Sequence, residues 1–334
     1  MNDEKPSSTY VITQDAPGQN AWLGKLWLWF SLSRPKFQLV GLLPYILGYL
    51  LASFYGYSTS WHVMILGGLG VVLIMLVTYY LGEYFDYEGD TINRSFNAFS
   101  GGTRVLQTGQ VKRSSALVVA LLLLIPIAAI GLALQFDYNC GPYTLLLGAL
   151  GVAAGAFYSA KPVQWAYHGL GEVLIGFSYG WLTVNTGYYL QTGRFNLVGT
   201  FVALPIMTSI TAVVLINEFP DYEADKAVQK HNLVVLLGPS LAIVLYYILI
   251  LSTLTFSFFT AVVAFSFPYQ FLPLILVPVV LKNLLDAQSG GAATPKTLES
   301  LCAGTLLLNM LVIFLPLACV ILELARQIIW LEAL

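Results

Sequence analysis

Two acidic stretches of this chain match each other and carry the residues best suited to chemistry. Residues 83–90 read EYFDYEGD and residues 218–225 read EFPDYEAD, with the same residue at five of the eight positions. Charged residues make up only 10% of the chain. Two matched runs of acids in so apolar a sequence therefore point to a shared function.

The aspartates in these stretches are spaced for metal binding. Asp86 and Asp90 are four residues apart, as are Asp221 and Asp225. At helical spacing each pair shares one face, about 6 Å apart along the axis, where like charges repel. Mg²⁺ relieves such repulsion, prefers carboxylate oxygens, and takes further ligands from phosphate groups. We predict that these four aspartates are metal ligands and catalytic residues that hold a diphosphate through Mg²⁺, although a single pair is equally typical of a solvated helix end.

Basic residues follow the same stretches and are suited to binding phosphate oxygens. Arg94 and Arg104 come after the first stretch, and Lys226 and Lys230 after the second; Lys161 follows a predicted helix between them. We predict substrate contacts for Arg94, Lys161, Lys226 and Lys230. Membrane topology alone also places basic residues at such positions, so each is weaker evidence than the aspartates.

The composition predicts that membrane helices position these residues. The chain has 334 residues, of which 57% are hydrophobic, and its mean hydropathy is +0.76. A spanning helix needs about 20 mostly apolar residues. Nine segments qualify: 37–54, 62–84, 115–135, 143–160, 170–190, 198–218, 240–260, 266–284 and 302–325. We expect an all-α polytopic membrane protein with a bundle of about nine transmembrane helices.

The sequence favours one domain behind a short polar segment. Residues 1–21 read as a polar N-terminal tail, and residues 22–334 as a single transmembrane domain. Residues 22–30, WLGKLWLWF, are typical of an interfacial helix with tryptophans at headgroup depth. Cys140, Cys302 and Cys319 have no metal-binding or redox spacing and are expected to be apolar filling.

The distribution of Lys and Arg predicts the orientation. With alternating spans, 13 of the 15 Lys and Arg residues fall on the side of the N-terminus, and only Arg194 and Arg326 fall on the other. Positive charge accumulates on the cytoplasmic side. We therefore expect the N-terminus and both acidic stretches to face the cytoplasm. For a prokaryotic source the expected location is the cytoplasmic (inner) membrane, and the sequence leaves an organellar source open.

The chain resembles the UbiA superfamily of intramembrane prenyltransferases, from SRPKFQLVGLLPYILGYLLA (33–52) to the last helices. That family has an NxxxDxxxD motif after its second helix and a DxxxD motif after its sixth. These fall on Asp86 and Asp90, and on Asn217, Asp221 and Asp225. The chain is most similar to MenA-type 1,4-dihydroxy-2-naphthoate polyprenyltransferases in SGGTRVLQTGQV (100–111), YSAKPVQWAYHGLGEVLIGFSYGWL (158–182) and NEFPDYEADKAVQKHNLVVLLG (217–238).

The resemblance implies a reaction and further site residues. A polyprenyl group would pass from its diphosphate to an aromatic acceptor, which loses CO₂ in MenA-type enzymes, with two Mg²⁺ ions on the aspartate pairs stabilising the departing pyrophosphate. Asn217 and Tyr158 would contact substrate, and aromatic rings including Tyr84, Phe85 and Tyr179 are candidates to face the allylic cation.

Several positions depart from the family pattern. The family Asn before the first aspartate is Gly82 here. Either Glu83, which we predict to contact substrate, or water takes its place, or the acceptor binds differently. The run after the second motif is Gln229–Asn232, followed by Leu236 where the family often has Arg, and the usual proline pair reads Lys161-Pro162. These departures leave open another acceptor, such as 4-hydroxybenzoate or a different quinone or lipid precursor.

Two other classes of protein also place acids in a membrane bundle. A transporter of divalent cations or phosphorylated lipids would carry them near the bilayer midplane, whereas here they lie at helix ends beside basic loops. CDP-alcohol phosphotransferases need a DGxxAR segment, which this sequence lacks. The expected partners are a polyprenyl diphosphate, an aromatic acceptor and the lipid bilayer, and no nucleic acid; prenyl chain length and oligomeric state do not follow from the sequence.

Overall fold

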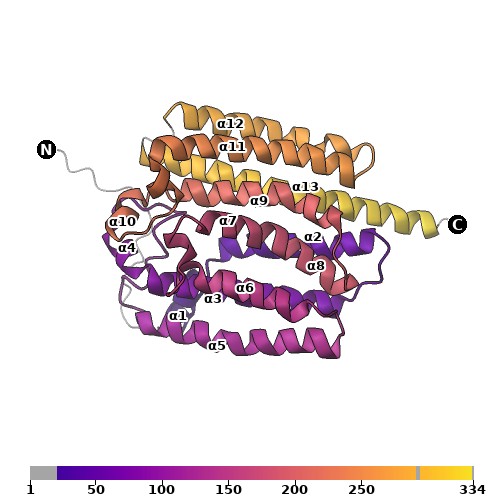
Figure 1. The fold of residues 1–334 in the computed structure, drawn as a ribbon, viewed down its shortest axis with the longest axis horizontal. Coiled ribbons are helices and arrows are strands. Elements are labelled where there is room, and N and C mark those ends of the chain that lie inside the picture. The colour runs from indigo at the N-terminus through magenta and orange to yellow at the C-terminus, as the bar shows by residue number, and fades with distance from the viewer. Residues whose placement is uncertain (1–20, 291–293, 333–334) are drawn as a thin grey trace.

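Helices account for all regular secondary structure in the described residues. The computed structural model describes residues 21–290 and 294–332, and within these ranges it contains no strand. The predicted polar tail falls almost entirely on residues 1–20 and so lies outside the described residues. The all-α prediction is confirmed, and Figure 1 shows the long helices running side by side from one end of the bundle to the other.

Most of the long helices match the predicted spans. Seven helical segments in the described residues are long and apolar enough to cross a membrane. They begin with α2 (Pro35–Phe54), α3 (Trp61–Phe85), α5 (Arg113–Leu132) with its π-helical continuation η1 (Ala133–Asp137), and α9 (Leu197–Asn217). The others are α11 (Leu233–Ala264), η4 with α12 (Tyr269–Ile275 and Leu276–Gln288), and α13 (Pro295–Glu332). The shorter apolar helix α6 (Thr144–Ser159) runs alongside them. So does a composite segment made of α7 (Gly171–Gly176), η3 (Phe177–Leu182) and α8 (Thr183–Thr192), in agreement with a bundle of about nine helices.

Two of the predicted segments differ from the helices in length. The segment predicted at 240–260 belongs to α11, which starts seven residues earlier because two helices join across Gly238. Gly238 has φ 72° and precedes Pro239, and glycine adopts this conformation without the cost of a Cβ. The segment predicted at 302–325 extends to Pro295–Glu332 in α13.

The segment predicted at 170–190 is helical but not uniformly α-helical. It comprises α7 (Gly171–Gly176), the π-helix η3 (Phe177–Leu182) and α8 (Thr183–Thr192). Gly176 and Gly180 lie against α9, where an added Cβ would collide with Thr211 and Met207. The close approach to α9 and the wide π turn together fix the direction of the η3 side chains, and π turns often occur at functional sites.

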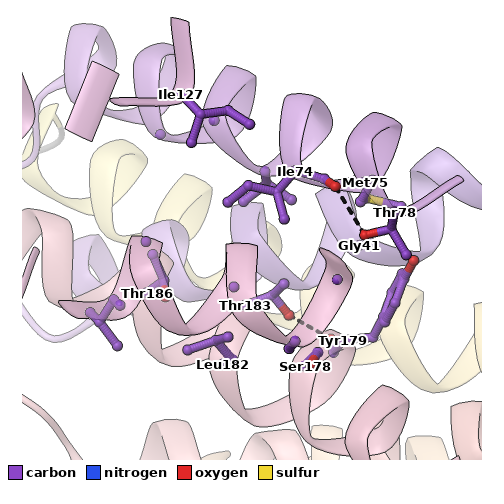
Figure 2. A pocket seen from close by; sticks show the side chains of 18 of the residues that line it. Gly41, Ile74, Met75, Thr78, Ile127, Ser178, Tyr179, Leu182, Thr183 and Thr186 are labelled. Atoms are coloured by element: carbon purple, nitrogen blue, oxygen red, sulfur yellow. Dashed lines mark hydrogen bonds between the residues drawn. The ribbon is translucent and has the colours of Figure 1, made fainter. Parts of the chain in front are cut away.

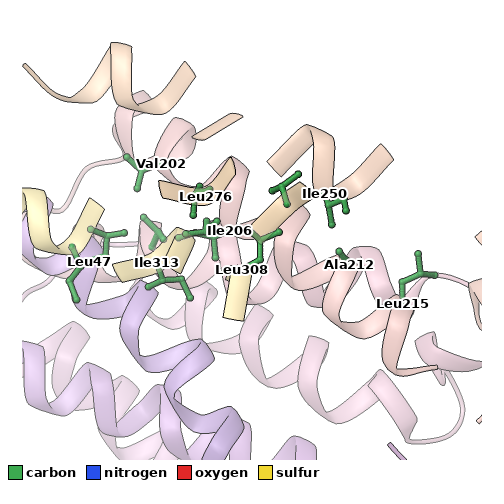
Figure 3. Close-up of a cluster of buried hydrophobic side chains, with 14 of the residues drawn as sticks. Leu47, Val202, Ile206, Ala212, Leu215, Ile250, Leu276, Leu308 and Ile313 are labelled. Carbon is green, nitrogen blue, oxygen red and sulfur yellow. The ribbon is translucent and has the colours of Figure 1, made fainter. Parts of the chain in front are cut away.

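A large apolar core holds one side of the bundle together. It joins α2, α8, α9, α11, α12 and α13, and Figure 3 shows Leu47, Ile206 and Ile313 among its fully buried members. These helices form a rigid frame because close-packed interiors deform little.

The segment predicted to be an interfacial helix is helical, as α1 (Ala21–Leu32). Trp29 packs edge-on against Tyr80 of α3, with ring centroids 5.6 Å apart. Trp22 and Trp27 are each 62% exposed, as expected for rings that contact lipid headgroups.

Candidate active site

The two acidic motifs lie at the ends of α3 and α9, each at the start of a short helix. Asp86 follows α3 and precedes α4 (Tyr87–Ile92), and Asp221 follows α9 and precedes α10 (Tyr222–Ala227). The Asp90 amide donates to the Asp86 carbonyl at 2.9 Å, and the Asp225 amide to the Asp221 carbonyl at 2.7 Å. Each pair is thus one helical turn apart, as predicted. Figure 1 shows α4 and α10 together at the same end of the bundle.

Hydrogen bonds from another segment orient the first motif. The Tyr167 hydroxyl donates to one carboxylate oxygen of Asp86 at 2.8 Å, and the Ser159 hydroxyl donates to the other at 3.0 Å. Gly82, at the position of the family Asn, lies beside this carboxylate: an added Cβ would be 3.9 Å from both Asp86 Oδ2 and Ser159 Oγ. The position therefore has room for a ligand group next to Asp86.

The second motif is held by a residue that follows the first. The Asn93 side-chain amide donates to Asp221 at 2.6 Å, and the Gly101 backbone amide donates to the other oxygen at 3.2 Å. Asp225 accepts from the Asn232 amide at 2.7 Å and faces the Lys230 ammonium at 3.5 Å. The loop after α4 therefore locks the two motifs together.

Lys230 lies among the aspartates of both motifs. Its side chain is mostly buried, and burial lowers its pKa, but Asp225 and Asp86 outweigh that effect and raise the pKa well above its usual value. Lys230 is therefore charged. Burial raises the pKa of Asp90, Asp221 and Asp225, and the charge of Lys230 offsets part of that rise.

One lysine does not neutralise these carboxylates. Burial, followed by the charges of Asp86 and Glu83, raises the pKa of Asp90 to about 8. Burial also raises the pKa of Asp225 to about 6, with contributions from Asp221 and from Asp86 of the other motif. Buried acids with raised pKa values are typical of functional sites, and the positive charge near these acids does not offset the effect of their burial.

Glu83 is fully buried and bound by protein groups. Arg34 donates to it at 2.7 Å, and Thr103 donates through its backbone amide at 2.9 Å and its hydroxyl at 3.0 Å. Arg34 also lies over the Tyr79 ring, 5.8 Å from its centroid. Glu83 thus ties α3 to the loop at Thr103, a loop that also contains the Gly101 amide bound to Asp221.

The other predicted substrate residues separate into exposed and buried groups. Arg94, Lys161 and Lys226 are exposed, and Lys226 lies 5.8 Å over the ring of Tyr222. Asn217, the last residue of α9, has a buried side-chain oxygen without a hydrogen-bond partner in the described part of the chain. Their substrate contacts stay predictions.

An apolar cavity of about 130 Å³ lies inside the bundle on the side of α3 and α6. Tyr158 lines it and is followed in α6 by Ser159, the hydroxyl bound to Asp86, so the cavity begins beneath the first motif. Figure 2 shows Ile74 and Thr78 on one side of the cavity and Ser178, Tyr179 and Leu182 from η3 on the other. A slot of this kind is suited to a hydrocarbon chain.

Sequence reasoning missed the residues that orient the carboxylates. Asn93 and Asn232 lie in polar loops next to the motifs, and Ser159, Tyr167 and Arg34 lie far from them in sequence. Proximity to the motifs was the sole signal for the two asparagines. No spacing in the sequence indicates the other three.

The donor set fits Mg²⁺ shared with a substrate. Within residues 21–290 and 294–332, no three His, Cys, Asp or Glu side chains are close enough to hold a metal ion by themselves. Mg²⁺ is commonly bound through one or two carboxylates plus substrate phosphates. The two aspartate pairs, with their raised pKa values, supply such carboxylates on either side of Lys230.

Solved structures of two UbiA homologs have the same fold. A UbiA homolog from Archaeoglobus fulgidus bound to GPP and Mg²⁺ aligns with a TM-score of 0.64 at 18% identity, over 88% of this chain and 99% of the other. An apo UbiA homolog from Aeropyrum pernix K1 aligns with a TM-score of 0.65 at 16% identity, over 85% and 97%.

Sequence comparisons point to the same group of enzymes. The chain is 28% identical to the 1,4-dihydroxy-2-naphthoate octaprenyltransferase of Bacillus subtilis over 70% of this chain and 72% of that one. It is 24% identical to the enzyme of the same name from Mycobacterium leprae, over 78% and 86%. The profile of the UbiA prenyltransferase family matches residues 41–297. With its two aspartate motifs at one end of a membrane bundle, the chain belongs to the UbiA prenyltransferase family and is an integral membrane enzyme that transfers prenyl groups.

Proposed function

We propose that the protein transfers a polyprenyl group from its diphosphate to 1,4-dihydroxy-2-naphthoate, a step of menaquinone biosynthesis. The observation that carries the proposal is the position of two interlocked aspartate pairs directly above an apolar slot. The names of the relatives from Bacillus subtilis and Mycobacterium leprae support the naphthoate as acceptor.

Different residues would bind the diphosphate and the prenyl chain of the donor. Asp86, Asp90, Asp221 and Asp225 would hold Mg²⁺, two ions by our prediction, which would stabilise charge on the departing diphosphate. Lys230 is charged and placed to donate to diphosphate oxygens. The prenyl chain would extend into the slot below Tyr158, where apolar walls exclude water from the allylic carbon.

The reaction needs no further co-substrate. The allylic C–O bond breaks and its electron pair leaves with the diphosphate. The electron-rich ring then forms a C–C bond to the allylic carbon, and the acceptor carboxyl leaves as CO₂. Tyr158 and Tyr179 line the slot, and their ring faces would favour the developing positive charge.

A transporter is less consistent with the geometry. Substrate sites of secondary transporters lie near the bilayer midplane. In this chain both motifs follow the ends of long helices, and α4 and α10 lie at one end of the bundle.

The test is a prenylation assay with matched variants. Purified protein in lipid nanodiscs receives Mg²⁺, a labelled polyprenyl diphosphate, and either 1,4-dihydroxy-2-naphthoate or 4-hydroxybenzoate. We expect product with the naphthoate, loss of product on chelation, and its return when Mg²⁺ is added. Asp221→Asn should lower the rate at least about 100-fold, as loss of transition-state charge stabilisation does.

The control is Asp137→Asn, the same change at an exposed residue outside both motifs, which should keep full activity. Product with the benzoate alone would contradict the proposed acceptor and keep the prenyl chemistry. Absence of both product and Mg²⁺-dependent binding of the diphosphate would contradict the aspartate site itself.

A further inference from the structure

The slot contains seven glycines, and helix packing explains five of them. An added Cβ at Gly67 or Gly155 would collide with Tyr45 or Thr78. Added Cβ atoms at the other three tightly packed positions would lie 2.6–3.3 Å from neighbouring side chains; these positions are Gly41, Gly131 and Gly151. Close contact between helices therefore accounts for these glycines.

Gly70 and Gly148 have no such packing reason. An added Cβ at Gly148 meets nothing within 4 Å, and one at Gly70 meets Ile130 alone, at an ordinary 3.6 Å. Glycine destabilises a helix interior relative to alanine, so a side chain at either position would fit and favour the helix. What a side chain would take away is space in the slot.

Both glycines lie on the helix faces that line the slot. In α6 the lining positions recur at helical spacing: Thr144, Leu147, Gly148, Gly151, Ala154, Gly155 and Tyr158. Ala149 lies on the exposed side of the same helix. In α3 they are Gly67, Gly70, Val71, Ile74, Met75 and Thr78. A side chain added at Gly70 or Gly148 would therefore enter the slot.

The register of α3 and α6 puts the two glycines at the same depth. Gly151 lies against Ile74 and Gly155 against Thr78, so one further turn pairs Gly148 with the turn that contains Gly70. Gly148 is ten residues from Tyr158, about 15 Å along the helix. An extended isoprene unit, four carbon–carbon bonds of about 1.5 Å each, advances about 5 Å. A chain that enters at Tyr158 thus reaches this level with about its third unit.

The slot has little spare volume at rest. A cavity of about 130 Å³ is similar in size to engineered cavities of about 150 Å³ that bind benzene. A long prenyl chain must therefore displace lining side chains as it enters. In so narrow a slot, the absence of side chains at Gly70 and Gly148 adds a large share of the space available at that depth.

We propose that Gly70 and Gly148 are specificity-determining residues that keep the deep half of the slot open to donors longer than about three isoprene units. The inference rests on the proposed prenyl donor. It predicts that a larger side chain at either position excludes long donors and spares short ones.

The test compares two donors in matched variants. The measured quantity is kcat/KM for geranylgeranyl diphosphate divided by that for geranyl diphosphate, with the same acceptor. Gly148→Leu and Gly70→Leu should each lower this ratio at least about tenfold, because added carbons strain a filled slot. Ala149→Leu, the same bulk on the exposed face of α6, should leave the ratio within about twofold of the parent.

Alanine and valine at positions 70 and 148 extend the series, and retained turnover of geranyl diphosphate shows that each variant is folded. A ratio that falls with side-chain size supports the inference. A ratio that stays constant, or equal losses for both donors at every size, overturns it. If the parent protein turns over neither donor with any acceptor, the proposed function fails first, and the inference fails with it.

Discussion

At the scale of single residues, the site is defined by four aspartates that share one buried lysine. Desolvation favours the protonated acids, whereas Lys230 favours the carboxylates. With a pKa of about 8, Asp90 retains its proton at pH 7 in the metal-free protein. Metal binding must therefore release protons.

This raised pKa predicts a pH-dependent affinity for Mg²⁺. Because Asp90 loses its proton near pH 8 and Asp225 near pH 6, the apparent affinity should rise roughly tenfold per pH unit from pH 6 to 8 and level off above. Calorimetry in two buffers of different ionisation enthalpy measures both the affinity and the protons released. Asp90→Asn should bind Mg²⁺ more weakly and with a shallower pH slope; an affinity of the parent protein that is independent of pH would contradict the prediction.

Whereas the affinity for Mg²⁺ should rise with pH, the stability of the metal-free protein should fall. Between about pH 4 and pH 8, folded Asp90 binds more protons than the unfolded chain does, so the free energy of unfolding should fall as pH rises through this window. Added Mg²⁺ should reduce that loss, since it binds the carboxylate form.

At the scale of elements, α7 holds the start of α11 through a buried carboxyl group. Glu172 is fully buried and accepts from the Leu233 amide at 2.6 Å. The neighbouring N-cap residue, Asn232, donates to Asp225. Glu218 lies near Glu172, and burial followed by the charge of Glu172 raises the pKa of Glu218 well above its usual value. We therefore expect Glu218 to be protonated.

This arrangement predicts different effects for two substitutions of Glu172. Glu172→Ala leaves the buried Leu233 amide without its partner, which should cost about 1–3 kcal/mol in the free energy of unfolding. Glu172→Gln keeps an acceptor for Leu233 and should stay close to the parent protein. Thermal unfolding in detergent at pH 7 measures both, with Glu223→Ala, an exposed glutamate of α10, as the control. Equal destabilisation by Ala and Gln would show that the charge of Glu172, not its hydrogen bond, is what matters.

At the scale of the whole molecule, both motifs lie at one end of the bundle, and the described C-terminal end of α13 lies at the other (Figure 1). The excess of Lys and Arg on the predicted side of the motifs predicts, by the positive-inside rule, that this end is cytoplasmic. This orientation would give both motifs access to a water-soluble diphosphate group and to cytoplasmic Mg²⁺.

The orientation predicts the labelling of single cysteines in bacterial spheroplasts. Arg194→Cys should react with a membrane-impermeant maleimide from outside, and Lys112→Cys should react only after permeabilisation, because both side chains are exposed but are predicted on opposite sides. The native cysteines Cys140, Cys302 and Cys319 are buried and free, so the parent protein is the background control. The reverse labelling pattern would contradict the orientation.

Hydropathy and motif spacing determined much of this protein on their own. The long apolar runs predict the spanning helices because a bilayer requires apolar length and internally bonded backbone. The duplicated DxxxD spacing predicts two carboxylate pairs, each on one helical turn, because the period of a helix is a local property.

Only the tertiary structure decided which groups meet those carboxylates. Asn93 reaches Asp221 across 128 residues, Tyr167 reaches Asp86 across 81, and of the predicted basic residues Lys230 alone is buried among the aspartates of both motifs, whereas Arg94, Lys161 and Lys226 are exposed. The separation of glycines needed for packing from those that keep the slot open likewise depends on neighbours from other helices. Such contacts follow from how the helices pack, and the periodicity of one segment carries no information about side chains that approach it from another.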